Sequence, residues 1–69
     1  MSVDPDLRDQ ILAAIPSLRA FAISLSGNVD RADDLVQETI LRALANIQSF
    51  QPGTNLPAWL FTILRNLFR

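Results

Sequence analysis

Reactive side chains are scarce in this chain. It has no cysteine, histidine, lysine or tyrosine, so carboxylates, hydroxyls, amides and six arginines remain. Without cysteine there are no disulfides or thiolate metal sites, and without histidine the commonest metal ligand and proton shuttle is missing. We predict no catalytic residue, metal site or cofactor. An enzyme would require turnover that depends on Asp33, Asp34 and Glu38, which are more simply capping and solvating charges.

Residues that could bind a nucleic acid are concentrated near the C-terminus. The formal net charge of −1 alone disfavours a nucleic-acid binder. However, no acidic residue follows Glu38, and the only charged residues beyond it are Arg42, Arg65 and Arg69. Arginines near Trp59, with hydroxyl and amide groups between them, can hold phosphates and stack on an unpaired base.

The alternative is that these polar residues are only the solvent-exposed face of a helix. The span 56–68 is apolar nearly all round and has one polar stripe at helical spacing. The stripe comprises Ala58, Thr62, Arg65 and Arg69, with Asn66 beside it. From the residues alone, a core helix with a solvated side and Trp59 in the core is the better-supported interpretation.

The element expected to organise the chain is a helix over residues 30–46. Its apolar positions recur at steps of three and four, the period of one buried helical face. These positions are Ala32, Leu35, Val36, Thr39, Ile40, Ala43, Leu44 and Ile47. Asp30 is the expected N-cap, and Asp33 and Asp34 are expected in the first turn, where carboxylates meet the positive end of the helix dipole.

The opposite face of this helix is a candidate interface. It carries Asp34, Gln37, Glu38, Leu41, Arg42 and Ala45. An outward leucine flanked by charged groups fits an apolar anchor with a polar rim. A single exposed leucine is also ordinary on any surface, so solvating charges remain the alternative.

A second helix is expected before the central one. Asp4 and Pro5 fit an N-cap and a first helical residue. Pro16 predicts a kink or a break near Ile15, and two abutting helices are equally possible. Gly27 suits the left-handed position after this segment.

A loop and a third helix complete the expected all-α fold. The Pro-Gly pair within residues 47–55 marks a loop. Phe50 is expected to plug the core from below. Asn55 is a suitable cap for the last helix, and Leu56 with Pro57 fits its first turn.

Two motifs in order carry a family resemblance. The first is DDLVQET at residues 33–39, followed by LRAL at 41–44, and the second is PAWLFTILRN at 57–66. Together they resemble region 2 of bacterial sigma factors, more narrowly the extracytoplasmic-function (ECF) group, and residues 51–57 resemble its general-stress branch. The resemblance implies a small all-α region 2 domain of three to four helices over residues 1–69.

The resemblance implies one surface for RNA polymerase. In the family, the helix matching residues 30–46 binds the clamp helices of the polymerase β′ subunit. The matched positions are Asp34, Gln37, Glu38, Leu41 and Arg42.

It also implies a surface for promoter DNA. ECF sigma factors use the last helix and the loop before it to open the −10 element and hold a flipped base of the non-template strand. A preformed pocket must offset the unstacking cost of a few kcal/mol. The matched positions are Phe50, Gln51, Thr54 and Asn55 as the pocket wall, Thr62 and Asn66 as polar contacts, and Arg65 and Arg69 near the backbone. Trp59 is expected to buttress the pocket from the core.

The expected role is a non-enzymatic, cytoplasmic module without a membrane segment, since the chain has no apolar run of about 20 residues. An anti-sigma partner is implied by the general-stress branch. The chain ends within a helical pattern, so we expect a fragment without the end of region 2 or the domain that reads the −35 element. The rival is a helical interaction module that never touches DNA. A DNA role predicts that Arg65, Arg69 and residues 50–55 converge on one face.

Overall fold

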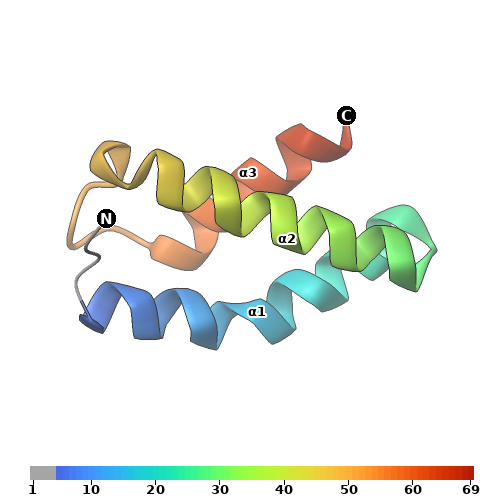
Figure 1. Cartoon of the computed structure of the whole chain (residues 1–69), viewed down its shortest axis with the longest axis horizontal. Coiled ribbons are helices and arrows are strands. Elements are labelled where there is room, and N and C mark those ends of the chain that lie inside the picture. The colour runs from blue at the N-terminus through green and yellow to red at the C-terminus, as the bar shows by residue number, and fades with distance from the viewer. Residues whose placement is uncertain (1–4) are drawn as a thin grey trace.

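Within residues 5–69, three α-helices and one short 3-10 turn form the fold. The structure, a computed structural model, describes residues 5–69. The elements are α1 (Pro5–Ser26), α2 (Val29–Ala45), the short 3-10 turn η1 (Ile47–Ser49) and α3 (Leu56–Phe68). α1 and α2 run antiparallel, and α3 crosses behind α2 in the view of Figure 1. Each helix packs against the other two, so the predicted all-α fold is confirmed with three helices.

α1 is one helix that continues through Pro16. Pro5 is its first residue, as predicted, whereas the predicted cap Asp4 lies outside the described residues. The predicted break near Ile15, with two abutting helices, is wrong, whereas the alternative of a kink within one helix stays a prediction. Proline removes the N–H that would bond the carbonyl of Leu12, but the side chains of Leu12 and Pro16 are exposed on this side, where water can replace the missing donor.

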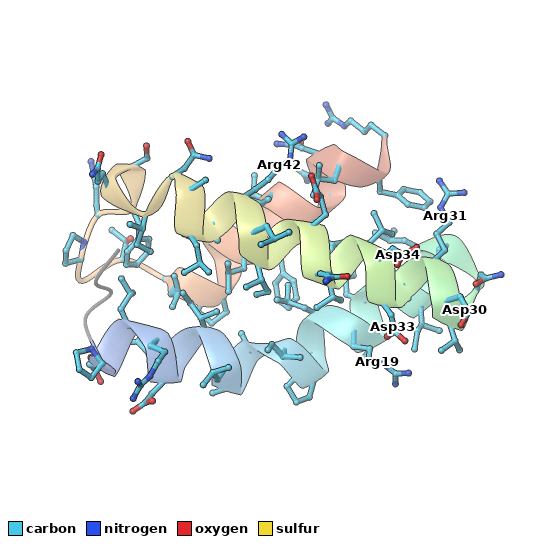
Figure 2. All side chains as sticks on the ribbon, viewed as in Figure 1. Arg19, Asp30, Arg31, Asp33, Asp34 and Arg42 are labelled. Atoms are coloured by element: carbon cyan, nitrogen blue, oxygen red, sulfur yellow. The ribbon has the colours of Figure 1, made fainter. Side chains whose placement is uncertain are left out.

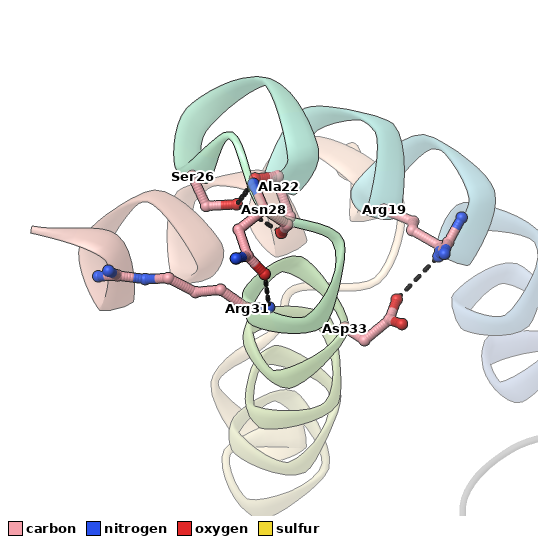
Figure 3. Close-up of polar contacts among 6 residues, drawn as sticks. All are labelled: Arg19, Ala22, Ser26, Asn28, Arg31 and Asp33. Carbon is pink, nitrogen blue, oxygen red and sulfur yellow. Dashed lines mark hydrogen bonds and ion pairs between the residues drawn. The ribbon is translucent and has the colours of Figure 1, made fainter.

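A two-residue turn joins α1 to α2. Gly27 has φ +67, the left-handed conformation predicted for it, and its N–H donates to the carbonyl of Ile23 at 2.8 Å. Asn28 is the N-cap of α2, and its Oδ1 accepts a hydrogen bond from the N–H of Arg31 at 2.9 Å (Figure 3). The prediction that Asp30 caps α2 is therefore wrong.

The early start of α2 also moves its acidic residues. Asp30 lies in the first turn, so it is the carboxylate that meets the positive end of the helix dipole. Asp33 and Asp34, expected in the first turn, follow in the second. Asp33 instead accepts a hydrogen bond from Nε of Arg19 on α1 at 2.8 Å, and the two side chains face each other in Figures 2 and 3. Both are about half exposed, so this pair contributes at most about 1 kcal/mol.

The core lies where the three helices meet, and side chains fill the space between the ribbons in Figure 2. Its buried apolar residues are Ile11, Ala14, Leu18, Ala22, Ala32, Val36, Ala43, Phe50, Leu56, Leu60 and Leu64. Thr39 is also fully buried, and its hydroxyl donates to the carbonyl of Leu35 at 2.7 Å. No helix within residues 5–69 is both long and apolar enough to cross a bilayer.

Candidate functional site

The outer face of α2 is the first candidate surface. Asp34, Gln37, Glu38 and Leu41 are all exposed, and the side chain of Leu41 is 56% accessible. The helix buries its opposite face against α1 and α3, because apolar residues recur there with the helical period. Four of the five predicted docking residues therefore share one solvent-facing surface, which we call the acidic face, whereas the fifth, Arg42, is exposed but lines the groove between α2 and α3.

The last turn of α3 borders the acidic face. A shallow hollow is lined by Arg31, Asp34, Leu35, Glu38 and Leu67. The guanidinium carbon of Arg31 lies 5.6 Å from the centroid of the Phe68 ring, within the range of a cation–π contact. Figure 2 shows Arg31 beside the end of α3. Within residues 5–69, no group of three or more acidic side chains could hold a metal ion.

Local hydrogen bonds start α3 and order the loop before it. Asn55 caps the helix as predicted, and its Oδ1 accepts a hydrogen bond from the N–H of Ala58 at 3.1 Å. The hydroxyl of Thr54 donates to the carbonyl of Gln51 at 2.7 Å. The hydroxyl of Thr62 donates to the carbonyl of Ala58 at 3.0 Å, which leaves its oxygen lone pairs able to accept from a partner.

Three of the eight predicted DNA residues line two hollows, Phe50 and Thr54 the first and Asn66 the second. Phe50 and Thr54 line a hollow of about 300 Å³ together with Leu7 and Gln10 of α1. Asn66 does not line it. Arg65 follows Asn55 by ten residues, which is about 15 Å along the helix axis. The predicted convergence of the loop with the C-terminal arginines is therefore not seen in these hollows, although Thr62, Arg65, Asn66 and Arg69 are exposed as expected.

The second hollow is a groove of about 370 Å³ between α2 and α3. It is lined by Arg42, Asn46, Ser49, Trp59, Ile63, Asn66 and Leu67, and we call it the Asn66 groove. Trp59 is half-buried, and its ring centroid lies 5.2 Å from that of Phe50, which has only 9% of its surface exposed. These rings link the two hollows. Phe50 does plug the core, whereas Trp59, which was expected in the core, is only partly buried against it and lines the groove.

Sequence reasoning missed Asn46 and Ser49 as groove residues. A signal was present, because Arg42, Asn46 and Ser49 follow each other at steps of four and three, so they continue one polar stripe past the end of α2. Asn46 ends this helix, and its Nδ2 donates to the carbonyl of Arg42 at 2.9 Å.

Comparison with known proteins gives the family. Residues 11–69 match the family described as Sigma-70 region 2. The chain belongs to this family. Along all 69 residues, this region 2 chain is 84% identical to the ECF RNA polymerase sigma factor EcfG of Rhodopseudomonas palustris (strain TIE-1) and covers 38% of that protein. Over 47 residues, or 68% of the chain, it is 49% identical to the ECF RNA polymerase sigma factor SigE of Mycolicibacterium smegmatis (strain ATCC 700084 / mc(2)155), of which the match covers 18%.

A solved structure has the same fold. In the complex of the sigma factor RpoE with the anti-sigma factor NepR from Bartonella quintana, the matching chain is 55% identical, with a TM-score of 0.86 over 94% of the region 2 chain and 41% of the RpoE chain. The region 2 chain thus spans less than half the length of these relatives. The predicted family and region 2 fold are confirmed.

Proposed function

We propose that this region 2 chain is the polymerase-docking and promoter-melting part of an ECF sigma factor of the general stress response. Membership of the Sigma-70 region 2 family and 84% identity to EcfG support the sigma-factor role. The observation that carries the proposal is the presence of two different surfaces: the exposed acidic face of α2 and the Asn66 groove between α2 and α3.

The acidic face is the proposed contact with the β′ clamp helices. Asp34 and Glu38 would pair with arginines of the partner, while Gln37 would add hydrogen bonds. Leu41, more than half exposed, would bury its side chain in an apolar pocket of the partner. An apolar anchor surrounded by polar contacts is the usual arrangement of a protein interface.

The groove and the loop are the proposed contacts with the non-template strand at the −10 element. The Asn66 groove combines an aromatic ring with amide and hydroxyl groups, a composition suited to an unpaired strand. Arg65 and Arg69 would hold phosphates, and Thr62 would accept a hydrogen bond. The loop residues Phe50, Gln51, Thr54 and Asn55 would form the wall for a flipped base, supported by the hollow beside Phe50.

An anti-sigma protein is a further proposed partner. The similarity to RpoE, which was crystallised with the anti-sigma factor NepR, supports this proposal. A protein that covers the acidic face or the groove would prevent both docking and strand binding.

Charge reversal tests docking. We expect Glu38→Arg to weaken binding to isolated β′ clamp helices at least about tenfold, because an attractive pair becomes repulsive. Asp9→Arg is the matched control, since it makes the same charge change on the exposed surface of α1, away from the acidic face. Equal binding by the parent and Glu38→Arg would contradict docking through this face.

Removal of the Asn66 amide tests strand recognition. With core polymerase and a promoter fragment that carries 2-aminopurine in the −10 region, Asn66→Ala should reduce the fluorescence increase on opening. Binding to the clamp helices should stay unchanged. An equal loss of promoter opening and of clamp-helix binding would point to misfolding. If the parent chain binds the clamp helices but no DNA strand, the rival interaction module is favoured.

A further inference from the structure

Arg42 lies on the border between the two proposed surfaces. It belongs to α2, like the acidic face, but its side chain lines the Asn66 groove and reaches from α2 toward α3 in Figure 2. Among the residues in the range 5–69 that line the groove, it is the one charged residue. Single-stranded nucleic acid needs cations beside its stacking surfaces, and Arg42 is the cation on the wall shared with Trp59.

An ion pair with Glu38 holds Arg42. Nε of Arg42 lies 3.5 Å from Oε1 of Glu38, one helical turn earlier, and the two side chains are 58% and 50% exposed. A pair this long and this exposed is weak, so either member can exchange its partner for another charge.

The position of Glu38 makes such an exchange relevant. Glu38 lines the hollow beside the acidic face, whereas Arg42 lines the groove, and Leu67 of α3 contributes to both. A cation that approaches the acidic face reaches Glu38 without entering the groove. Arg42 would then lose its carboxylate partner while still facing the groove.

We propose that Arg42 is a phosphate-binding residue of the Asn66 groove, restrained by Glu38 until a cation of the docked polymerase takes that carboxylate. This inference rests on the proposed function and reassigns Arg42 from polymerase contact to strand contact. Because linkage is reciprocal, a bound strand that holds Arg42 also frees Glu38 for the polymerase. Given the strength of an exposed pair at this spacing, the coupling is about twofold in affinity.

The test is a double-mutant cycle on binding of a mixed-sequence single-stranded DNA decamer at low salt. Trp59 is the only tryptophan and lines the groove, so its fluorescence reports binding at this site. Glu38→Gln should tighten decamer binding about twofold. Arg42→Ala should weaken it several-fold and lower the magnitude of the slope of log Kobs against log salt concentration by about 0.7, the value for one lost phosphate contact with a single strand. In the Arg42→Ala background, Glu38→Gln should have no further effect.

Asp30→Asn is the matched control. It removes one negative charge from the same helix but lies in the first turn, outside both hollows. If Asp30→Asn tightens binding as much as Glu38→Gln, or if Glu38→Gln acts equally with and without Arg42, general charge explains the effect and the inference is overturned. If Asn66→Ala weakens decamer binding but Arg42→Ala does not, the inference fails while the proposed function stands. A parent chain that binds no decamer overturns the inference and the proposed strand contact, while docking on the clamp helices is judged separately by Glu38→Arg.

Discussion

Leu60 and Leu41 are the same residue type in opposite environments. Leu60 is fully buried in the core, whereas 56% of Leu41 is exposed on the acidic face. We predict that Leu60→Ala lowers the free energy of unfolding by about 2–5 kcal/mol, through lost burial and a residual cavity. For a chain of 69 residues, total stability is on the order of 3–10 kcal/mol, so this variant should be close to unfolded.

Leu41→Ala is the matched control and should change the free energy of unfolding by less than about 0.5 kcal/mol. Urea unfolding followed by circular dichroism measures both variants. Similar losses would mean that Leu41 packs inside the protein, which would also exclude it as an anchor for a partner.

Thr39 shows why helical periodicity predicted the burial of single residues correctly. It was placed with the apolar face of α2 because of its position in the repeat, although it is polar. The structure buries it completely and satisfies its hydroxyl with the carbonyl of Leu35 in the preceding turn. A short hydroxyl can bond within its own helix, so helical spacing decided its side more strongly than residue type.

At the scale of elements, the caps set where helices begin. Asn28→Ala should destabilise the protein by about 1 kcal/mol, because the N–H of Arg31 loses its acceptor. Asp30→Ala removes only a favourable charge from the first turn and should cost about 0.3–1 kcal/mol at low salt, falling as salt screens the dipole. Thermal unfolding at two salt concentrations separates the two effects. A larger, salt-independent loss in Asp30→Ala would contradict the observed cap.

The sequence pattern alone could not show which residue caps α2. Asn28 and Asp30 are both good capping residues, so residue type does not choose between them. The choice depends on Gly27, whose left-handed backbone reverses the chain at once and lets α2 begin at Val29. The cap at Asn55, two residues before Pro57, was predicted correctly.

Pro16 gives the second prediction about an element. Because α1 is continuous there, Pro16→Ala restores one backbone hydrogen bond and removes a poor helix former. We expect the free energy of unfolding to rise by about 1–2 kcal/mol, less than the full propensity difference, because proline also restricts the unfolded chain. Urea unfolding measures the change. A loss of stability would instead mean that the proline geometry is needed for α1 to pack on α2 and α3.

At the scale of the whole molecule, the arrangement of the helices created a site that the sequence showed only in part. The hydrophobic repeats placed the exposed faces correctly, but they do not state how α3 crosses α2. That crossing brings Asn66 beside Arg42 and Asn46, and it leaves the loop hollow next to α1. The polar stripe of Arg42, Asn46 and Ser49 was readable from the sequence, but only this geometry shows that it forms a wall of a groove with α3.

The charge distribution of the whole molecule limits its affinity for DNA. The net charge is −1, and the cations beyond Glu38 are Arg42, Arg65 and Arg69. With three phosphate contacts to a single strand, log Kobs should fall with log salt concentration with a slope of about −2. Titration of Trp59 fluorescence with a single-stranded decamer at several salt concentrations measures this slope.

Arginine variants locate the contacts behind that slope. Arg65→Ala combined with Arg69→Ala should bring the slope to about −0.7, since one contact would remain. Arg8→Ala combined with Arg19→Ala is the matched control, because it also removes two cations, both on the exposed surface of α1 and outside the groove. An equal change in this control, or a slope steeper than about −4, would mean that strand contacts spread well beyond the C-terminal half. Under the proposed function, docking on the polymerase would be the step that brings the groove to the promoter, because the attraction expected here is weak and localised.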